Sequence, residues 1–150
     1  PAYVASHWES VEEGAQRSGR TPERSQWRMV REVFVADTDA EAWRMSVESH
    51  MGRMYREYFL PLLSNFGFFE YLKHDPDVPD SDITPEYCAK HNWIVGSPDT
   101  VARKITEMSE GVGGFGTLLM LGFDYADDAD AWHNSLRLLS EEVLPKVAHL

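Results

Sequence analysis

The stretch Trp93–Asp124, with the sequence WIVGSPDTVARKITEMSEGVGGFGTLLMLGFD, decides the fold class. It contains, in order, a helix start, an amphipathic helix, a glycine-rich loop and an apolar strand. Ser97 is a residue type that caps free helix amides, Pro98 suits the first helical position, and Asp99 favours the positive end of the helix dipole. Together these residues predict a helix that starts at Pro98.

The predicted helix carries an apolar stripe, because Val101, Ile105 and Met108 recur at i, i+4 and i+7. Four of the six residues 111–116 are glycine, which predicts that the helix ends before them. The next segment, Thr117–Leu121, is apolar without polar alternation, as expected of a strand covered on both faces. A helix that leads into such a strand is typical of an α/β protein with a parallel sheet.

The chain before this stretch supplies one more strand. A helix is predicted over Tyr3–Arg17 and a strand over Trp27–Ala36, from the spacing of their apolar residues. Thr38 and Glu41 then form a capping box, Thr-x-x-Glu, which predicts the start of a helix that runs to about Phe59.

The remaining segments are an irregular middle and a closing helix. Residues 60–93 are apolar but show no regular period, apart from one short helical turn that starts at Thr84. The closing helix is predicted from Asp128 to about Leu144, ending before Pro145. Only two convincing strands result, which are too few for an independent α/β sheet.

Composition excludes several functional classes. The 150 residues carry a formal net charge of -11, which argues against nucleic-acid binding. No apolar run approaches the length of a membrane span. The single cysteine, Cys88, cannot form an internal disulfide and fits the reducing cytoplasm, where we expect the protein to lie. The six histidines are scattered without the spacing of a zinc site, so no metal site is predicted.

Two features suggest a phosphate site at first sight. The glycines of residues 111–116 follow a helix and open a strand, the reverse of a dinucleotide fingerprint, so we interpret them as a plain connection. Gly96 and Ser97 stand at a helix start whose backbone amides are suited to a phosphate of a cofactor. A purely structural cap is the more common use of such a sequence, and the residues leave both readings open.

A substrate pocket is suggested by aromatic residues and by the positions that follow the strands. Tyr55 and Phe59 have the flat side chains that line pockets for organic substrates, although such residues also build cores. Asp124 and Tyr125 follow the second predicted strand, where the active site lies if the sheet belongs to a closed barrel. No nucleophile–base pair or carboxylate pair is evident, so the catalytic residues are unknown from the sequence.

Several motifs occur together in a characteristic order. They are HWE at residues 7–9, EEGA at 12–15, GRTP at 19–22, WR at 27–28, VFVADTDAEA at 33–42, VGSPD at 95–99, GGFGTLL at 113–119 and SEEVLP at 140–145. In this order and spacing they resemble the C-terminal portion of the bacterial luciferase-like, flavin-dependent monooxygenases. The resemblance covers most of the chain and is weakest between Met51 and Lys90.

The resemblance implies an α/β fold that is the last quarter of a (β/α)8 TIM-type barrel, with two parallel strands and several helices. Since a complete barrel of this type needs about 250 residues, we expect residues 1–150 to be a fragment, the C-terminal segment of a single barrel domain. The segment from Met45 to Trp93, which includes the irregular residues 60–93, corresponds in this reading to a variable insertion near the mouth of the active site.

The resemblance also implies the chemistry of the intact parent. Such enzymes use oxygen and reduced FMN, supplied by a separate flavin reductase, to oxygenate a small organic substrate. We expect the parent to form homo-oligomers and this chain alone to be inactive. Two alternatives remain open: a deazaflavin-dependent oxidoreductase on the same barrel, and a non-enzymatic helical domain that pairs with a partner chain.

Overall fold

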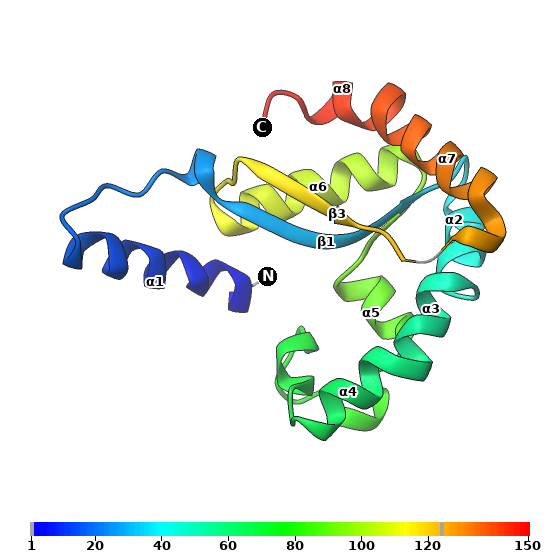
Figure 1. Cartoon of the computed structure of the whole chain (residues 1–150), viewed down its shortest axis with the longest axis horizontal. Helices are drawn as coiled ribbons and strands as arrows, with labels where there is room; N and C mark the ends of the chain where they lie inside the picture. The colour runs from blue at the N-terminus through cyan, green and yellow to red at the C-terminus, as the bar shows by residue number, and fades with distance from the viewer. Residues whose placement is uncertain (1, 124) are drawn as a thin grey trace.

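The computed structural model describes residues 2–123 and 125–150, and within them it shows an α/β arrangement with three strands (Figure 1). The strands are β1 (Arg28–Val35), β2 (Ile94–Gly96) and β3 (Thr117–Leu121). The helices are α1 (Ala2–Arg17), α2 (Asp39–Ser46), α3 (His50–Met54), α4 (Leu60–Asn65), α5 (Pro85–His91), α6 (Pro98–Val112), α7 (Ala129–Leu138) and α8 (Leu144–Val147). Turns of π-helix at Tyr55–Phe59 and Leu139–Val143 join α3 to α4 and α7 to α8.

The sheet is parallel and has β1 at its centre. The first half of β1 pairs with β3, with Arg28 opposite Thr117, and its second half pairs with β2, with Val33 opposite Ile94. The parallel α/β prediction is therefore confirmed, but the count of two strands was wrong. The third strand, β2, has only three residues, too few to show a periodicity in the sequence.

One face of the sheet is covered by helices of this chain. Val33 and Val35 of β1 point toward α6 and the closing helices, where they pack with Val101, Ile105 and Leu138. All five side chains are at most 6% exposed. The predicted apolar stripe of α6 therefore lies on the sheet, as its spacing indicated.

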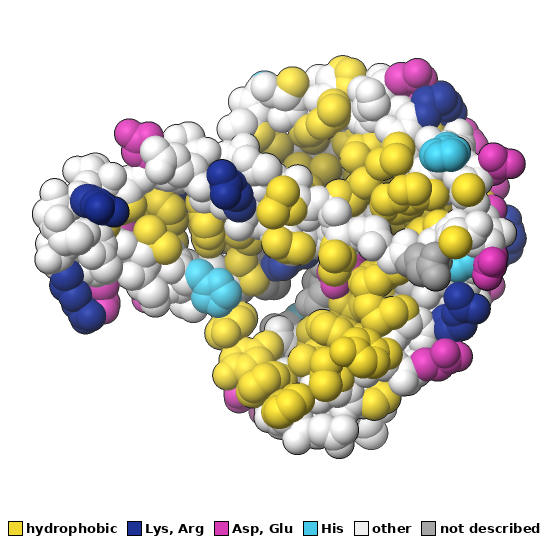
Figure 2. All heavy atoms as spheres, in the orientation of Figure 1, with side chains coloured by type: hydrophobic (Ala, Val, Ile, Leu, Met, Phe, Trp, Pro, Cys, Tyr) yellow, Lys and Arg dark blue, Asp and Glu magenta, His cyan; other side chains and the backbone are white. Residues whose placement is uncertain are grey.

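The opposite face is covered only near the carboxyl ends of the strands. There Phe34 is fully buried, whereas Val30, Leu119 and Leu121 on the same face are 49%, 46% and 39% exposed. The prediction that Thr117–Leu121 is covered on both faces is therefore wrong for the described residues, because none of their helices lies over this half of the face. Figure 2, in which α6 lies behind the strands, shows hydrophobic side chains gathered over the strands and over the lower arm of the molecule.

The helix predicted from Thr38 to Phe59 is interrupted. The hydroxyl of Thr38 accepts a hydrogen bond from the backbone amide of Glu41 at 3.1 Å, which confirms the predicted start. However, α2 ends at Ser46 and a new helix begins at His50. The two helices approach so closely that a Cβ on Gly52 would lie 1.7 Å from the Val47 carbonyl oxygen. Only glycine permits this contact, so the chain bends here although its apolar spacing continues.

Two predicted helix ends differ by a few residues. Helix α6 continues through Gly111 to Val112, and Gly113 then adopts a left-handed conformation with φ 77°, the common end of a helix. The closing helix does not end before Pro145. The π-helical turn before it leads into α8, where Pro145 stands in the first turn and needs no hydrogen-bond partner for its nitrogen.

Arg24 fastens the amino-terminal helix to the sheet. Its guanidinium group lies over the rings of Trp8 and Trp27, 4.5 and 5.7 Å from their centroids. It also donates a hydrogen bond to the carbonyl oxygen of Val112 at the end of α6. The Arg24 side chain thereby contacts α1, the residue before β1 and the carboxyl end of α6, where the helix dipole is negative.

Candidate functional site

An aromatic cluster forms where the carboxyl ends of the strands meet the arm built from α3 to α5. Its central side chain is Tyr55, which is 2% exposed. The Tyr55 ring lies 4.6 Å from Trp93, 4.9 Å from Phe59 and 6.0 Å from Phe123, measured between centroids. Tyr55 and Phe59 stand in the π-helical turn Tyr55–Phe59, a backbone form that is frequent at functional sites.

Glu32 provides a carboxylate beside this cluster. Residue alternation in β1 places Glu32 on the same face as Phe34, opposite Leu121 of β3. The hydroxyl of Tyr55 donates a hydrogen bond to Oε1 of Glu32 at 2.5 Å. Burial first, and then the charge of Glu32, raise the pKa of Tyr55 above its ordinary value. The phenol therefore stays neutral and keeps its proton for this hydrogen bond.

A second group of rings surrounds Tyr125. Its ring stacks on Phe34 and Trp132, at 5.2 Å between centroids in both cases, and lies 4.5 Å from the ring of His50. Burial raises the pKa of Tyr125, so this phenol is also neutral. Phe34, a residue of β1, packs in the same core cluster as both groups of rings.

Two buried nitrogen atoms in these groups have no hydrogen-bond partner among the described residues. They are Nε1 of Trp93 and Nδ1 of His50. Buried polar atoms in folded proteins are nearly always paired. Unpaired atoms beside aromatic rings are thus candidates for contact with a ligand or with further protein.

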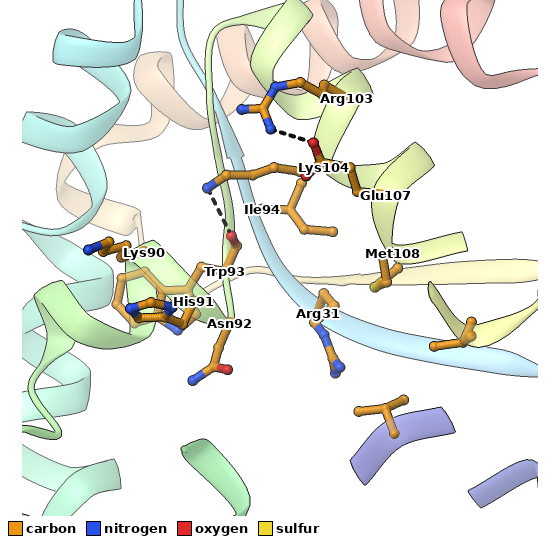
Figure 3. A pocket seen from close by; sticks show the side chains of 12 residues that line it. Arg31, Lys90, His91, Asn92, Trp93, Ile94, Arg103, Lys104, Glu107 and Met108 are labelled. Atoms are coloured by element: carbon orange, nitrogen blue, oxygen red, sulfur yellow. Dashed lines mark hydrogen bonds and ion pairs between the residues drawn. The ribbon is translucent and has the colours of Figure 1, made fainter. Parts of the chain in front are cut away.

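The backbone of Trp93 and of the strand β2 that follows it is held in place by Lys104. Its Nζ donates to the carbonyl oxygens of Trp93 and Val95, at 3.2 Å each, from the wall of a separate cavity of about 320 Å³ (Figure 3). Burial lowers the pKa of Lys104. On the same wall Arg103 is paired with Glu107 at 2.8 Å. Lys104 thus supports the backbone next to the aromatic cluster.

The predicted phosphate site has a different arrangement from the one expected. The backbone amide of Ser97 donates to Oδ1 of Asp39 at 2.6 Å, and the hydroxyl of Thr100 donates to Oδ2 at 3.0 Å. The Ser97 side chain makes no capping hydrogen bond, so the prediction that it caps α6 was wrong. The position next to Gly96 where an external anion would bind is filled by the carboxylate of Asp39.

The predicted pocket residues are partly brought together. Tyr55 and Phe59 lie in one cluster and Tyr125 lies in the neighbouring one, whereas Asp124 lies outside the described residues. Sequence reasoning missed Glu32 as a site residue. Phe34 and Trp93 were also missed as site residues, although each lies one residue from the end of a strand.

Other kinds of site receive no support in residues 2–123 and 125–150. No group of three or more metal-ligating side chains is found there, and no helix among them has the length and apolar character needed to cross a membrane. Burial raises the pKa of the Cys88 thiol to about 12, so it is not a nucleophile near neutral pH.

Comparison with known proteins gives consistent relatives. No family model matches the chain. The chain is 40% identical over 141 residues to the 3,6-diketocamphane 1,6-monooxygenase of Pseudomonas putida, covering 94% of this chain and 37% of that protein. It is 38% identical over 146 residues to the 2,5-diketocamphane 1,2-monooxygenase 1 of the same organism, covering 96% and 40%. The chain therefore spans 37–40% of the length of these curated relatives.

Solved structures agree with the sequence relatives. The oxygenating constituent of 3,6-diketocamphane monooxygenase from Pseudomonas putida, a type II Baeyer–Villiger monooxygenase in complex with FMN, superposes with a TM-score of 0.86 at 40% identity, covering 94% of this chain and 39% of that one. A monooxygenase from Streptomyces bottropensis has the same fold over 95% of this chain and 37% of its own, with a TM-score of 0.62 at 20% identity. By sequence and by fold, the chain matches part of the diketocamphane monooxygenases, which agrees with the resemblance of its motifs to the luciferase-like, flavin-dependent monooxygenases.

Proposed function

We propose that this chain forms one section of a barrel that uses reduced FMN and oxygen to oxygenate a small organic substrate. The observation that carries the proposal is the partly uncovered face of the sheet. Val30, Leu119 and Leu121 form an exposed apolar surface that leads directly to the buried aromatic cluster around Tyr55. In a barrel this face is the interior, and the carboxyl ends of the strands carry the active site. The relatives' names supply the reaction class.

The residues present fit a role at the ring system of the cofactor rather than at its phosphate. Asp39 fills the helix start at Ser97, so an FMN phosphate would be bound by other strands of the barrel. Val30, Leu119 and Leu121 instead offer exposed apolar surface of the kind that holds flat organic molecules. Reduced FMN, when bound, supplies the activation of oxygen.

The contribution of this chain is to shape the cavity and to exclude water. The arm from α3 to α5 packs Tyr55, Phe59 and Trp93 over the carboxyl end of β1, which removes this region from solvent. A dry cavity prevents loss of reactive oxygen species to water before the substrate reacts. In this proposal, residues 60–93 form the variable wall that selects the substrate, and a separate reductase delivers the reduced cofactor in the cytoplasm.

The relatives favour this proposal over the deazaflavin alternative, since they are named as monooxygenases and one of them holds FMN. The non-enzymatic alternative explains the exposed face by pairing with a partner chain. It does not explain why the curated relatives are named as monooxygenases.

A chimera tests the proposal directly. The chain would replace the matching segment of the 3,6-diketocamphane 1,6-monooxygenase, and the product would be supplied with reduced FMN and a bicyclic ketone. We expect one FMN to bind per chimera and an oxygenated product to form. The chain alone should bind no stoichiometric FMN, because most cofactor contacts lie elsewhere in the barrel. A folded chimera that binds no flavin, or tight one-to-one binding by the chain alone, would refute the proposal.

A further inference from the structure

Glu32 is a charged side chain on an otherwise apolar face. Its neighbours on that face are Val30, Phe34 and, across the ladder, Leu121. It is half-buried, and no lysine, arginine or histidine pairs with it among the described residues, whose ion pairs all involve other carboxylates. A carboxylate in such surroundings is costly unless it is hydrogen-bonded. Its position therefore calls for an explanation beyond packing.

Tyr55 accounts for only one of the two carboxylate oxygens. Its hydroxyl donates to Oε1 at 2.5 Å, and among the described residues no hydrogen bond reaches Oε2. The phenol proton is already used, so the pair as a whole offers an acceptor and no donor. A carboxylate oxygen has capacity for at least one further hydrogen bond. The group that completes it must carry an N–H or O–H.

The surroundings restrict what that group can belong to. On its face of the sheet Glu32 is bordered by the exposed apolar side chains of Val30 and Leu121, and such a surface accepts a compact apolar body rather than a charged one. Pockets for small molecules commonly combine an apolar wall with a few polar groups that fix the orientation of the ligand. Glu32 and Tyr55 have the form of such a polar group, with Tyr55 fixing the rotamer of Glu32.

We propose that Glu32, oriented by Tyr55, recognises a hydroxyl group on the substrate, so that the preferred substrate class is a compact alicyclic ketone that also carries a hydroxyl. The inference rests on the proposed function and specifies its substrate. A hydroxyl donates to Oε2 in a charge-assisted hydrogen bond, whereas a carbonyl at the same place brings its lone pairs against the carboxylate. Glu32 is thereby a specificity-determining residue and Tyr55 a positioning residue.

The test compares two ligands that differ only at this point: a bicyclic diketone, and the hydroxyketone in which one of its two carbonyls is reduced. Binding of each to the FMN-loaded chimera is measured by calorimetry, and kcat/KM is measured where turnover occurs. We expect the hydroxyketone to bind at least about tenfold more tightly. In Glu32→Gln, whose amide also donates, the preference should fall to about one or reverse.

Two further variants separate recognition from stability. Tyr55→Phe keeps the ring and frees the carboxylate, so the preference should fall while FMN binding stays unchanged. Glu48→Gln removes an exposed carboxylate with no partner among the described residues and should leave the preference intact. An equal preference in the parent chimera and in Glu32→Gln, or a parent chimera that favours the diketone, would overturn the inference.

The two proposals fail in different ways. If the chimera folds but neither binds FMN nor oxygenates either ligand, the proposed function is refuted. The ligand preference is also measured on the 150-residue chain itself by ligand-observed NMR, with and without Glu32→Gln, so it is decided independently of turnover. A chain that binds both ligands equally, with Glu32 present, refutes the substrate assignment even if the chimera is active.

Discussion

Asp39 holds together the carboxyl ends of two strands, and its removal makes a quantitative test of the structure. Its carboxylate accepts hydrogen bonds from the Ser97 amide at 2.6 Å and from the Thr100 hydroxyl at 3.0 Å, at the start of α6. Loss of a helix-capping acceptor costs about 0.5–2 kcal/mol, and loss of a negative charge at a helix start costs about 0.3–1 kcal/mol more. Because Asp39 is exposed to solvent, we expect Asp39→Ala to lower the free energy of unfolding by about 2 kcal/mol.

The pH dependence of this loss gives a sharper test than its size. Hydrogen bonding by the Ser97 amide lowers the pKa of Asp39 below 3.8. A depressed carboxyl pKa contributes stability that is complete above the unfolded-state value of about 3.9 and is lost as the pH falls through the folded-state value. The difference between the parent chain and Asp39→Ala should therefore be constant near neutral pH and shrink below about pH 4.

Urea unfolding followed by circular dichroism, at one fixed protein concentration, measures both effects. Asp37→Ala is the matched control, since Asp37 is an exposed neighbour that makes no hydrogen bond or ion pair within the described part of the chain. Asp39→Asn keeps one acceptor but not the charge, so it should lie between the parent and Asp39→Ala. A destabilisation that is equal for Asp37→Ala and Asp39→Ala, or that does not change with pH, would refute the reasoning.

Three further predictions follow from other contacts. Arg24→Met should lower the free energy of unfolding in urea by about 2–3 kcal/mol, because it removes a charged hydrogen bond and two cation–π contacts. Arg24→Lys should recover about half of this loss, and equal losses in the two variants would contradict a role for the planar guanidinium group. Burial first, and then the His74 ring stacked at 3.9 Å, lower the pKa of His91. The NMR titration midpoint of His91 should therefore lie below about 6.5 and should rise in His74→Ala. A midpoint that is unchanged in His74→Ala would exclude the contact between the two rings. Leu119→Lys should reduce self-association of the chain in sedimentation experiments, because Leu119 belongs to the exposed apolar face of the sheet. Leu136 is similarly exposed on α7, and Leu136→Lys should leave self-association unchanged. The reverse result would show that the chains associate through a different surface.

The sequence predicted the features that depend on neighbouring residues. The starts of α2, α5 and α6 were recognised from Thr38, Thr84 and Pro98, because a cap acts on amides two or three residues away. The apolar period of α6 and the apolar run of β3 were also visible, since each reflects a regular repeat along one segment. These local signals were sufficient for the α/β class and for the parallel sheet.

The features that the sequence did not predict depend on residues far apart in the chain. Asp39 and Ser97 are 58 positions apart, and Glu32 and Tyr55 are 23 apart. Neither pair has a spacing that a helix or strand would impose, so no periodicity brings them to notice. The short strand Ile94–Gly96 exists because β1 offers it a free edge, and it has too few residues to be recognised alone. The residues predicted for the pocket, Tyr55, Phe59, Asp124 and Tyr125, therefore did not include Glu32.

The uncovered half of the sheet connects the sequence pattern to the proposed function. Leu118 and Met120 of β3 pack against the helical side, while Leu119 and Leu121, of the same chemical type, lie largely open. Folding of these residues alone gives no reason for apolar side chains at Leu119 and Leu121, since an exposed strand face in a parallel sheet is normally covered. Their apolar character is explained if a further layer of protein or a bound organic molecule completes that face, as it does in the interior of a barrel. A variant with polar residues at both positions should therefore keep the helical side of the sheet intact but abolish FMN binding in the chimera; retention of full FMN affinity would show that this face is not the interior of the site.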